Sequence, residues 1–149
     1  MSKTILAYFD SRCETSTGFS CVGSWGKDEH DKVLFTKQET VKLVTPSKAQ
    51  YLALFCTIAE LIKALGEDWP KVTIHSNSKL LITQVNGIWK PSKPETVELN
   101  NKAVGLKIKY GFAMHWMSGK NNAIATALTQ QEPQKPRYLL SNGLFRPKH

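Results

Sequence analysis

Cysteine, acidic residues and long apolar runs are all scarce in this sequence, and each shortage excludes a class of protein. Three cysteines, Cys13, Cys21 and Cys56, are an odd number without CxxC spacing among 149 residues, which argues against a disulfide framework and a zinc site. No apolar run approaches the length that crosses a bilayer, and the N-terminal segment becomes polar too early for a signal peptide. We therefore expect an intracellular protein, most simply a cytoplasmic one in a reducing environment.

The shortage of acidic residues makes the chain basic. Twenty Lys and Arg residues against 12 Asp and Glu residues give a formal net charge of +8 and a pI near 9.5. This balance favours a partner rich in negative charge, first nucleic acid and then an anionic membrane surface. Net charge is equally compatible with a basic surface that binds nothing, so charge alone does not identify a partner.

Hydrophobic periodicity divides the chain into nine elements. Strands are predicted over 4–11, 17–26, 32–41, 71–76 and 112–117, and helices over 45–66, 78–87, 95–111 and 121–131. The order β-β-β-α-β-α-α-β-α predicts an α/β domain over 1–131 with a mixed five-stranded sheet flanked by helices. Residues 132–149, with three prolines and four Lys or Arg residues, are interpreted as an irregular, basic C-terminal tail.

Five short motifs follow one another along this frame. They are YFDS at the end of the first strand, TPSKAQYLAL at the start of the first helix, HSNSKLL after the fourth strand, then NGIWK, and finally WMSGKNNAIATAL. In this order and spacing the chain resembles the ribonuclease H family, in its compact cellular form, over roughly residues 3–130. The resemblance implies a ribonuclease H-like fold and phosphodiester hydrolysis with two Mg²⁺ ions held by four carboxylates.

Three of those four carboxylates are replaced here. The family pattern falls on Asp10, which is retained, and on the neutral residues Gln50, Asn77 and Thr126. A single carboxylate offers too little negative charge for two dications, so we expect no cofactor, and Mg²⁺ or Mn²⁺ only if residual activity exists. Asp10 is then the one candidate metal ligand, or simply a residue at a strand end. Glu14, in a predicted loop, is the sole acid placed to substitute.

The resemblance also implies a groove for a nucleic-acid duplex. Its candidate contacts are Arg12, Cys13, Thr15, Thr45, Ser47, Lys48, Ser78, Lys79, Trp89, Lys90, Lys120 and Asn121. Hydroxyl groups suit phosphate and 2′-hydroxyl groups, and the cations follow the backbone. Two of these residues have an alternative structural reading, because Ser47 is a plausible helix N-cap and Trp89 could anchor a helix in the core.

These observations favour a catalytically inactive ribonuclease H-like protein, a pseudonuclease that binds an RNA/DNA hybrid or double-stranded RNA through backbone and 2′-hydroxyl contacts. Whether the chain is an enzyme stays open, with the replaced carboxylates arguing against it. One alternative is a protein-interaction module on the same fold, with the apolar YLLSNGLF of the tail as a docking segment. Another is a residual metal-dependent ribonuclease H endonuclease that uses Asp10, the amide oxygens and Glu14.

Overall fold

The first three strands form an antiparallel meander, and two parallel strands extend it on the side of the first strand. The computed structural model describes residues 3–130, 138–139 and 145–146. The strands are β1 (Thr4–Glu14), β2 (Phe19–Asp28), β3 (Val33–Lys42), β4 (Lys71–Ser76) and β5 (Ala113–Trp116). They lie in the order β3-β2-β1-β4-β5, with β4 parallel to both β1 and β5. The mixed five-stranded sheet expected from the sequence is confirmed.

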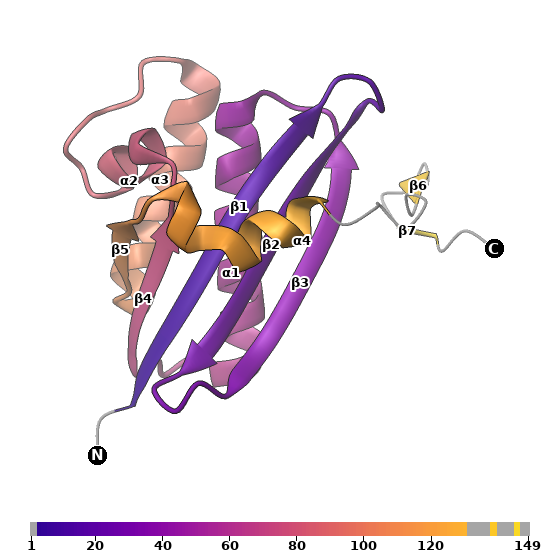
Figure 1. The fold of residues 1–149 in the computed structure, drawn as a ribbon. Helices are drawn as coiled ribbons and strands as arrows, with labels where there is room; N and C mark the ends of the chain where they lie inside the picture. The colour runs from indigo at the N-terminus through magenta and orange to yellow at the C-terminus, as the bar shows by residue number, and fades with distance from the viewer. Residues whose placement is uncertain (1–2, 131–137, 140–144, 147–149) are drawn as a thin grey trace.

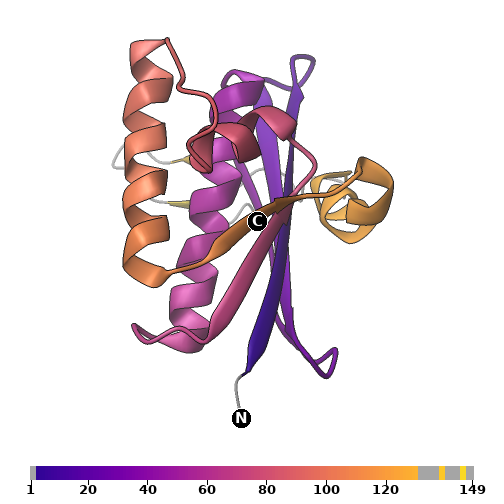
Figure 2. The ribbon, with the colours of Figure 1, turned by 90° about the vertical axis from the view of Figure 1, so that its left-hand side faces the viewer.

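Helices cover both faces of this sheet (Figures 1 and 2). They are α1 (Pro46–Leu65), α2 (Lys79–Val85), α3 (Pro94–Tyr110), the 3-10 turn η1 (Gly119–Asn122) and α4 (Ala123–Gln130). Figure 2 shows α1 and α3 on one side of the strands and α4 on the other. The core lies under α1, where alternate β1 residues such as Ile5 and Phe9 are buried with Leu54 and Ile58. None of the helices in the described part of the chain is long and apolar enough to cross a membrane.

The N-cap of α1 lies two residues before the expected one. Thr45, and not Ser47, is the N-cap, since its side chain accepts a hydrogen bond from the backbone N–H of Lys48 at 3.3 Å. Pro46 takes the first helical position, where its fixed φ suits the helix and its missing N–H has no intrahelical partner in any case. Gly66, with φ of 77°, follows the last turn as expected from the sequence.

The β1–β2 hairpin is longer than the sequence indicates. The polar residues 12–16, between the two predicted strands, were expected to be a loop, but strand pairing continues through Arg12 opposite Cys21 to Glu14 opposite Phe19. Asp10 therefore lies within β1 and pairs with Gly23 of β2. A Cβ atom at Gly23 would lie 2.6 Å from a side-chain carbon of α4, so the glycine allows α4 to approach the sheet next to Asp10.

Within the predicted tail, Tyr138–Leu139 (β6) and Phe145–Arg146 (β7) form a short antiparallel pair, although the sequence indicated only irregular structure there. Of the proposed docking segment YLLSNGLF, residues 140–144 lie outside the described residues, and its docking role stays a prediction.

Candidate functional site

Asp10 is the centre of a polar cluster between β1, α1 and α4. Its side chain is 7% exposed. The Thr126 hydroxyl donates a hydrogen bond to Oδ2 at 2.7 Å, and the Ser11 N–H donates one to Oδ1 at 2.8 Å. The Gln50 amide nitrogen lies 3.5 Å from the same Oδ1. Three of the four positions that the motifs aligned thus meet at one carboxylate.

Asn77, the fourth position, joins this cluster through a residue that sequence reasoning missed. The side-chain amide of Asn122 is buried and donates to the Phe9 carbonyl at 2.8 Å and to Asn77 Oδ1 at 3.3 Å. Phe9 precedes Asp10, so Asn122 connects the end of β4 to the centre of β1. The backbone carbonyl of Asn77 also accepts a hydrogen bond from the Trp116 indole at 3.2 Å. The sequence signal that could have identified Asn122 is its position in the motif WMSGKNNAIATAL, next to Asn121, which was chosen as a candidate contact instead.

Two buried carbonyl oxygens near this cluster have no hydrogen-bond partner among the described residues. They belong to the side chains of Gln50 (Oε1) and Asn122 (Oδ1). Buried acceptors are normally satisfied by protein or by ordered water, so both oxygens are available to a donor from solvent or from a ligand.

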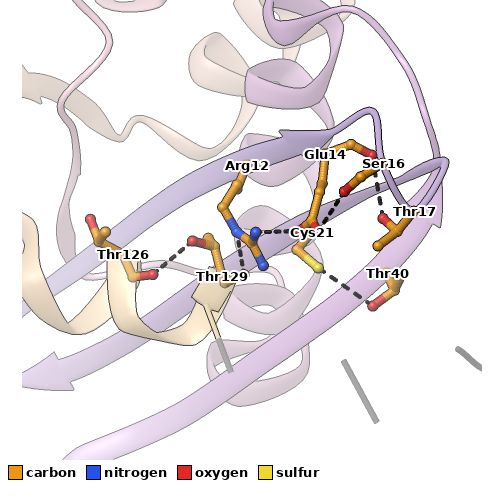
Figure 3. A network of polar contacts seen from close by, with 8 residues as sticks. All are labelled: Arg12, Glu14, Ser16, Thr17, Cys21, Thr40, Thr126 and Thr129. Atoms are coloured by element: carbon orange, nitrogen blue, oxygen red, sulfur yellow. Dashed lines mark hydrogen bonds and ion pairs between the residues drawn. The ribbon is translucent and has the colours of Figure 1, made fainter. Parts of the chain in front are cut away.

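Glu14, the acid that sequence analysis offered as a substitute ligand, is engaged elsewhere. It lies in β1 and not in a loop, and it forms an ion pair with Arg12 (Figure 3). The Arg12 Nε donates to the Thr129 carbonyl at 3.0 Å, which places the guanidinium against α4. Ser16 donates to the second carboxylate oxygen of Glu14 at 3.1 Å. Across the described ranges, no three His, Cys, Asp or Glu side chains are grouped so that they could hold a metal ion.

A cleft of about 950 Å³ opens on the α1 side of β1. Four of the predicted contact residues line it: Cys13, Thr45, Ser47 and Ser78. Gln50 lines this cleft and also approaches Asp10, so it connects the cleft to the Asp10 cluster, whereas Asp10 and Thr126 do not line the cleft. Its other wall is the start of α3 and the segment before it, from Pro91 to Thr96, with Lys93 as the cation.

The cleft floor is held by a buried hydrogen-bond chain across three helices. Tyr51 of α1 donates to Gln84 Oε1 of α2 at 2.7 Å, and Asn100 of α3 donates to the Tyr51 oxygen at 3.0 Å. Burial raises the pKa of Tyr51, which keeps the phenol protonated as the donor in this chain. The chain fixes the relative positions of the elements that carry the cleft residues.

The remaining predicted contacts lie outside the cleft lining. Thr15, Lys79, Trp89, Lys90, Lys120 and Asn121 are exposed, and Lys48 is half-buried. Trp89 is 67% exposed, so the alternative that it anchors a helix in the core is wrong. Lys79 is not isolated, because its ammonium lies 4.8 Å from the centre of the Trp116 ring. Arg12 points to the α4 side of β1, whereas its neighbours Ser11 and Cys13 line the cleft.

This architecture matches solved ribonuclease H structures over nearly their whole length. The ribonuclease H1 named LC11, solved in complex with an RNA/DNA hybrid, superimposes with a TM-score of 0.77 at 23% identity, covering 85% of this chain and 94% of that one. The ribonuclease H1 of the halophilic archaeon Halobacterium salinarum NRC-1 gives 0.77 at 20% identity, over 86% and 96% of the two chains. The N-terminal ribonuclease H domain of Rv2228c from Mycobacterium tuberculosis gives 0.76 at 21% identity, over 87% and 92%.

The chain therefore has the ribonuclease H fold, as its motifs implied. No family model matches the sequence. At these identities the likeness defines the fold alone, and a fold does not determine the function of its site.

Proposed function

We propose that this protein is a catalytically inactive member of the ribonuclease H fold class that binds a nucleic-acid duplex, either an RNA/DNA hybrid or double-stranded RNA. The observation that carries the proposal is the hydrogen bonding at Asp10. A hydroxyl and an amide nitrogen, both hydrogen-bond donors, face the carboxylate from the positions where the family pattern has acids.

The residues around Asp10 do not fit a pair of magnesium ions. Mg²⁺ requires oxygen ligands in near-octahedral geometry, and two neighbouring dications need several carboxylates to offset their repulsion. The cluster supplies one carboxylate, and Thr126 already donates to it at 2.7 Å. An ion at Asp10 would have to displace that hydrogen bond and would gain no second negative charge in return.

The cleft next to Asp10 suits a sugar–phosphate backbone. Its lining combines small hydroxyl-bearing side chains, among them Thr45, Ser47 and Ser78, with two charged residues, Lys93 and Glu95. Hydroxyls hydrogen-bond phosphate and 2′-hydroxyl oxygens without reading the base sequence, and the 2′-hydroxyl distinguishes RNA from DNA. LC11, which shares the fold, was solved with an RNA/DNA hybrid, and this supports the choice of ligand.

Replacing three acids by neutral residues also changes the electrostatics of the groove. Near an active cluster of carboxylates, the phosphates of a duplex are repelled unless metal ions are present. Here a net charge of +8 and a single carboxylate at the cluster favour binding of a polyanion in the absence of divalent metal. We therefore expect binding that is salt-dependent, largely independent of base sequence and unaffected by chelator.

The test is a combined gel-shift and cleavage assay on one mixed-sequence RNA/DNA hybrid, with double-stranded RNA and double-stranded DNA as comparisons. Each is incubated with Mg²⁺, with Mn²⁺ and with chelator. We expect binding of the RNA-containing duplexes in all three conditions, no cleavage, and weaker binding of DNA. Chelator-sensitive cleavage would contradict the proposal and favour a residual endonuclease. Absence of both binding and cleavage would contradict it in favour of a protein-interaction module.

Two lysine variants locate the contact. Lys93→Ala removes the ammonium that lines the cleft, and it sacrifices no cap, because the Lys93 side chain makes no capping hydrogen bond to α3. The matched control is Lys32→Ala, an exposed lysine in the β2–β3 turn. We expect Lys93→Ala to reduce the slope of log affinity against log salt by about 1, with no change for the control. Equal effects of the two variants would show that the cleft is not the binding surface.

A further inference from the structure

A second polar site lies on the opposite side of the sheet from the cleft. The parallel strands β4 and β5 place His75 directly opposite His115 in register. Side chains opposite each other in neighbouring strands point to the same face, and the two imidazole rings lie 5.9 Å apart, centre to centre, at 89°. This face is the one that carries Tyr8, whose ring stacks on His75, and it is separate from the helices that line the cleft.

The hydrogen bonding of His75 fixes which ring nitrogen is free. Its Nδ1 lies 3.0 Å from the Ala7 carbonyl oxygen, which can only accept, so Nδ1 carries the proton. Nε2 then has an unshared electron pair, and no hydrogen-bond partner for it exists among the described residues. Metal-binding histidines are typically held in this way, with one ring nitrogen donating to a backbone carbonyl and the other left for the ion.

The orientation of the His75 ring is fixed by stacking. Tyr8 lies 4.7 Å from it at 14°, and Trp25 stacks on the far side of Tyr8 at 4.8 Å and 16°. Burial lowers the pKa of His75, with the Ala7 hydrogen bond opposing the effect and the proximity of His115 adding to it, which favours the neutral form of the ring. A neutral, oriented imidazole needs neither deprotonation nor much ordering before it binds an ion.

The spacing of the two rings agrees with a shared ion. Imidazoles that bind one metal through nitrogens about 2.1 Å away place their ring centres about 5–6 Å apart, and 5.9 Å is observed. His115 is exposed, so its ring is free to adjust. With imidazole nitrogens and no carboxylate, the pair suits borderline metals and not Mg²⁺ or Ca²⁺.

We propose that His75 and His115 form a binding site for a transition-metal ion, Cu²⁺, Ni²⁺ or Zn²⁺, on the β4–β5 face of the sheet. Water completes the coordination sphere, since no third His, Cys, Asp or Glu joins the pair among the residues that the structure describes. The affinity follows the usual order for imidazole ligands, with Cu²⁺ above Ni²⁺ and Zn²⁺. The site is independent of Asp10 and of the proposed binding of nucleic acid.

The test is a titration of the untagged 149-residue chain with each of Cu²⁺, Ni²⁺ and Zn²⁺ at pH 7.5, by competition with a chromogenic chelator. We expect one ion per chain and a loss of affinity of about tenfold or more in both His75→Ala and His115→Ala. Because the two ligands share one ion, we expect the affinity of the double variant for the ion to be at most about threefold lower than that of either single variant. Two further variants are matched controls: His30→Ala, in the exposed β2–β3 turn, and His149→Ala, at the C-terminus, should each bind as the parent does.

A spectroscopic readout separates ligation from an indirect effect of folding. The electron paramagnetic resonance spectrum of the Cu²⁺ complex should show hyperfine coupling to two imidazole nitrogens, and to one after His115→Ala, whose exposed side chain is not needed for the core. Unchanged affinity in both ligand variants, a loss of affinity in His30→Ala or His149→Ala, or no binding by the parent protein would each overturn the proposal. Asp10→Asn should leave the titration unchanged, so this test and that of the nucleic-acid interface fail separately.

Discussion

The hydrogen bond between Thr126 and Asp10 makes a quantitative prediction about stability. Thr126→Val keeps the shape of the side chain and its helix propensity but removes the donor to Asp10 Oδ2, now at 2.7 Å. Hydrogen bonds to a charged group contribute about 1.5–3 kcal/mol, and the acceptor here is a carboxylate that is 7% exposed, so solvent replaces the lost partner poorly. At about 2–4 °C for each kcal/mol in a chain of this size, the melting temperature should fall by roughly 3–12 °C.

Thermal denaturation measures the fall in melting temperature, and urea denaturation measures the loss of unfolding free energy, with an unchanged slope as evidence that the unfolded state is unaffected. The matched control is Thr83→Val, because the Thr83 hydroxyl donates to a carbonyl on the exposed side of α2, and a change below about 0.5 kcal/mol is expected there. In the Asp10→Asn background the cost of Thr126→Val should shrink, since a neutral acceptor is left. Equal effects of the two valine substitutions, or full additivity with Asp10→Asn, would refute the account of a charge-assisted hydrogen bond at Asp10.

Three further predictions concern other parts of the molecule. Gly23→Ala should destabilise the protein by roughly 1–3 kcal/mol, because its Cβ would lie 2.6 Å from a side-chain carbon of α4. Gly105→Ala, whose Cβ would have nothing within 4 Å, should stabilise α3 by about 0.5–1 kcal/mol. Urea denaturation midpoints check both, and a Gly23→Ala variant as stable as the parent would contradict the close packing. His75 has a pKa below its unfolded value of about 6.5, so the unfolded chain binds the proton more readily and stability is lost as pH falls below about 6.5. Between pH 7.5 and 5.5 the urea midpoint should fall less in His75→Gln than in the parent protein. An equal fall in the two proteins would contradict the burial argument. Burial raises the pKa of the Cys56 thiol to about 11, so at pH 8 this thiol should react with a disulfide reagent far more slowly in the folded protein than in urea; similar rates would show that it is accessible.

The order of strands and helices could be predicted because each element carries its own hydrophobic period. α1 is recognisable from the three- to four-residue spacing of Leu52, Phe55, Ile58, Ile62 and Leu65. Of these only Ile58 is fully buried, because the buried face of the helix runs through Leu54, Ile58 and Leu61. The extension of β1 through Arg12 to Glu14 carries no such signal, since these polar residues are held by backbone pairing with β2. The cap of α1 was misassigned for a related reason, as Thr45 and Ser47 are chemically similar and only the backbone conformation distinguishes them.

The members of the polar cluster at Asp10 could be predicted from the sequence, but their contacts could not. Motif spacing identified Asp10, Gln50 and Thr126, and all three meet in the structure. The ion pair between Glu14 and Arg12 could not be predicted, because both residues were expected in a loop. Their side chains share one face only once β1 is known to continue through Glu14. The partners of His75 are set by strand order, because Tyr8 and His115 lie 67 residues and 40 residues away in the sequence but on the two neighbouring strands.

The central claim is that the active site was lost by replacement of acids while the binding groove was kept. The most direct measurement compares cleavage of one RNA/DNA hybrid by the parent protein and by the variant that carries Gln50→Glu, Asn77→Asp and Thr126→Asp. We expect no cleavage by the parent, Mg²⁺-dependent cleavage by the triple variant, and loss of that activity when Asp10→Asn is added. Chelator-sensitive cleavage by the parent protein, abolished by Asp10→Asn, would contradict the account.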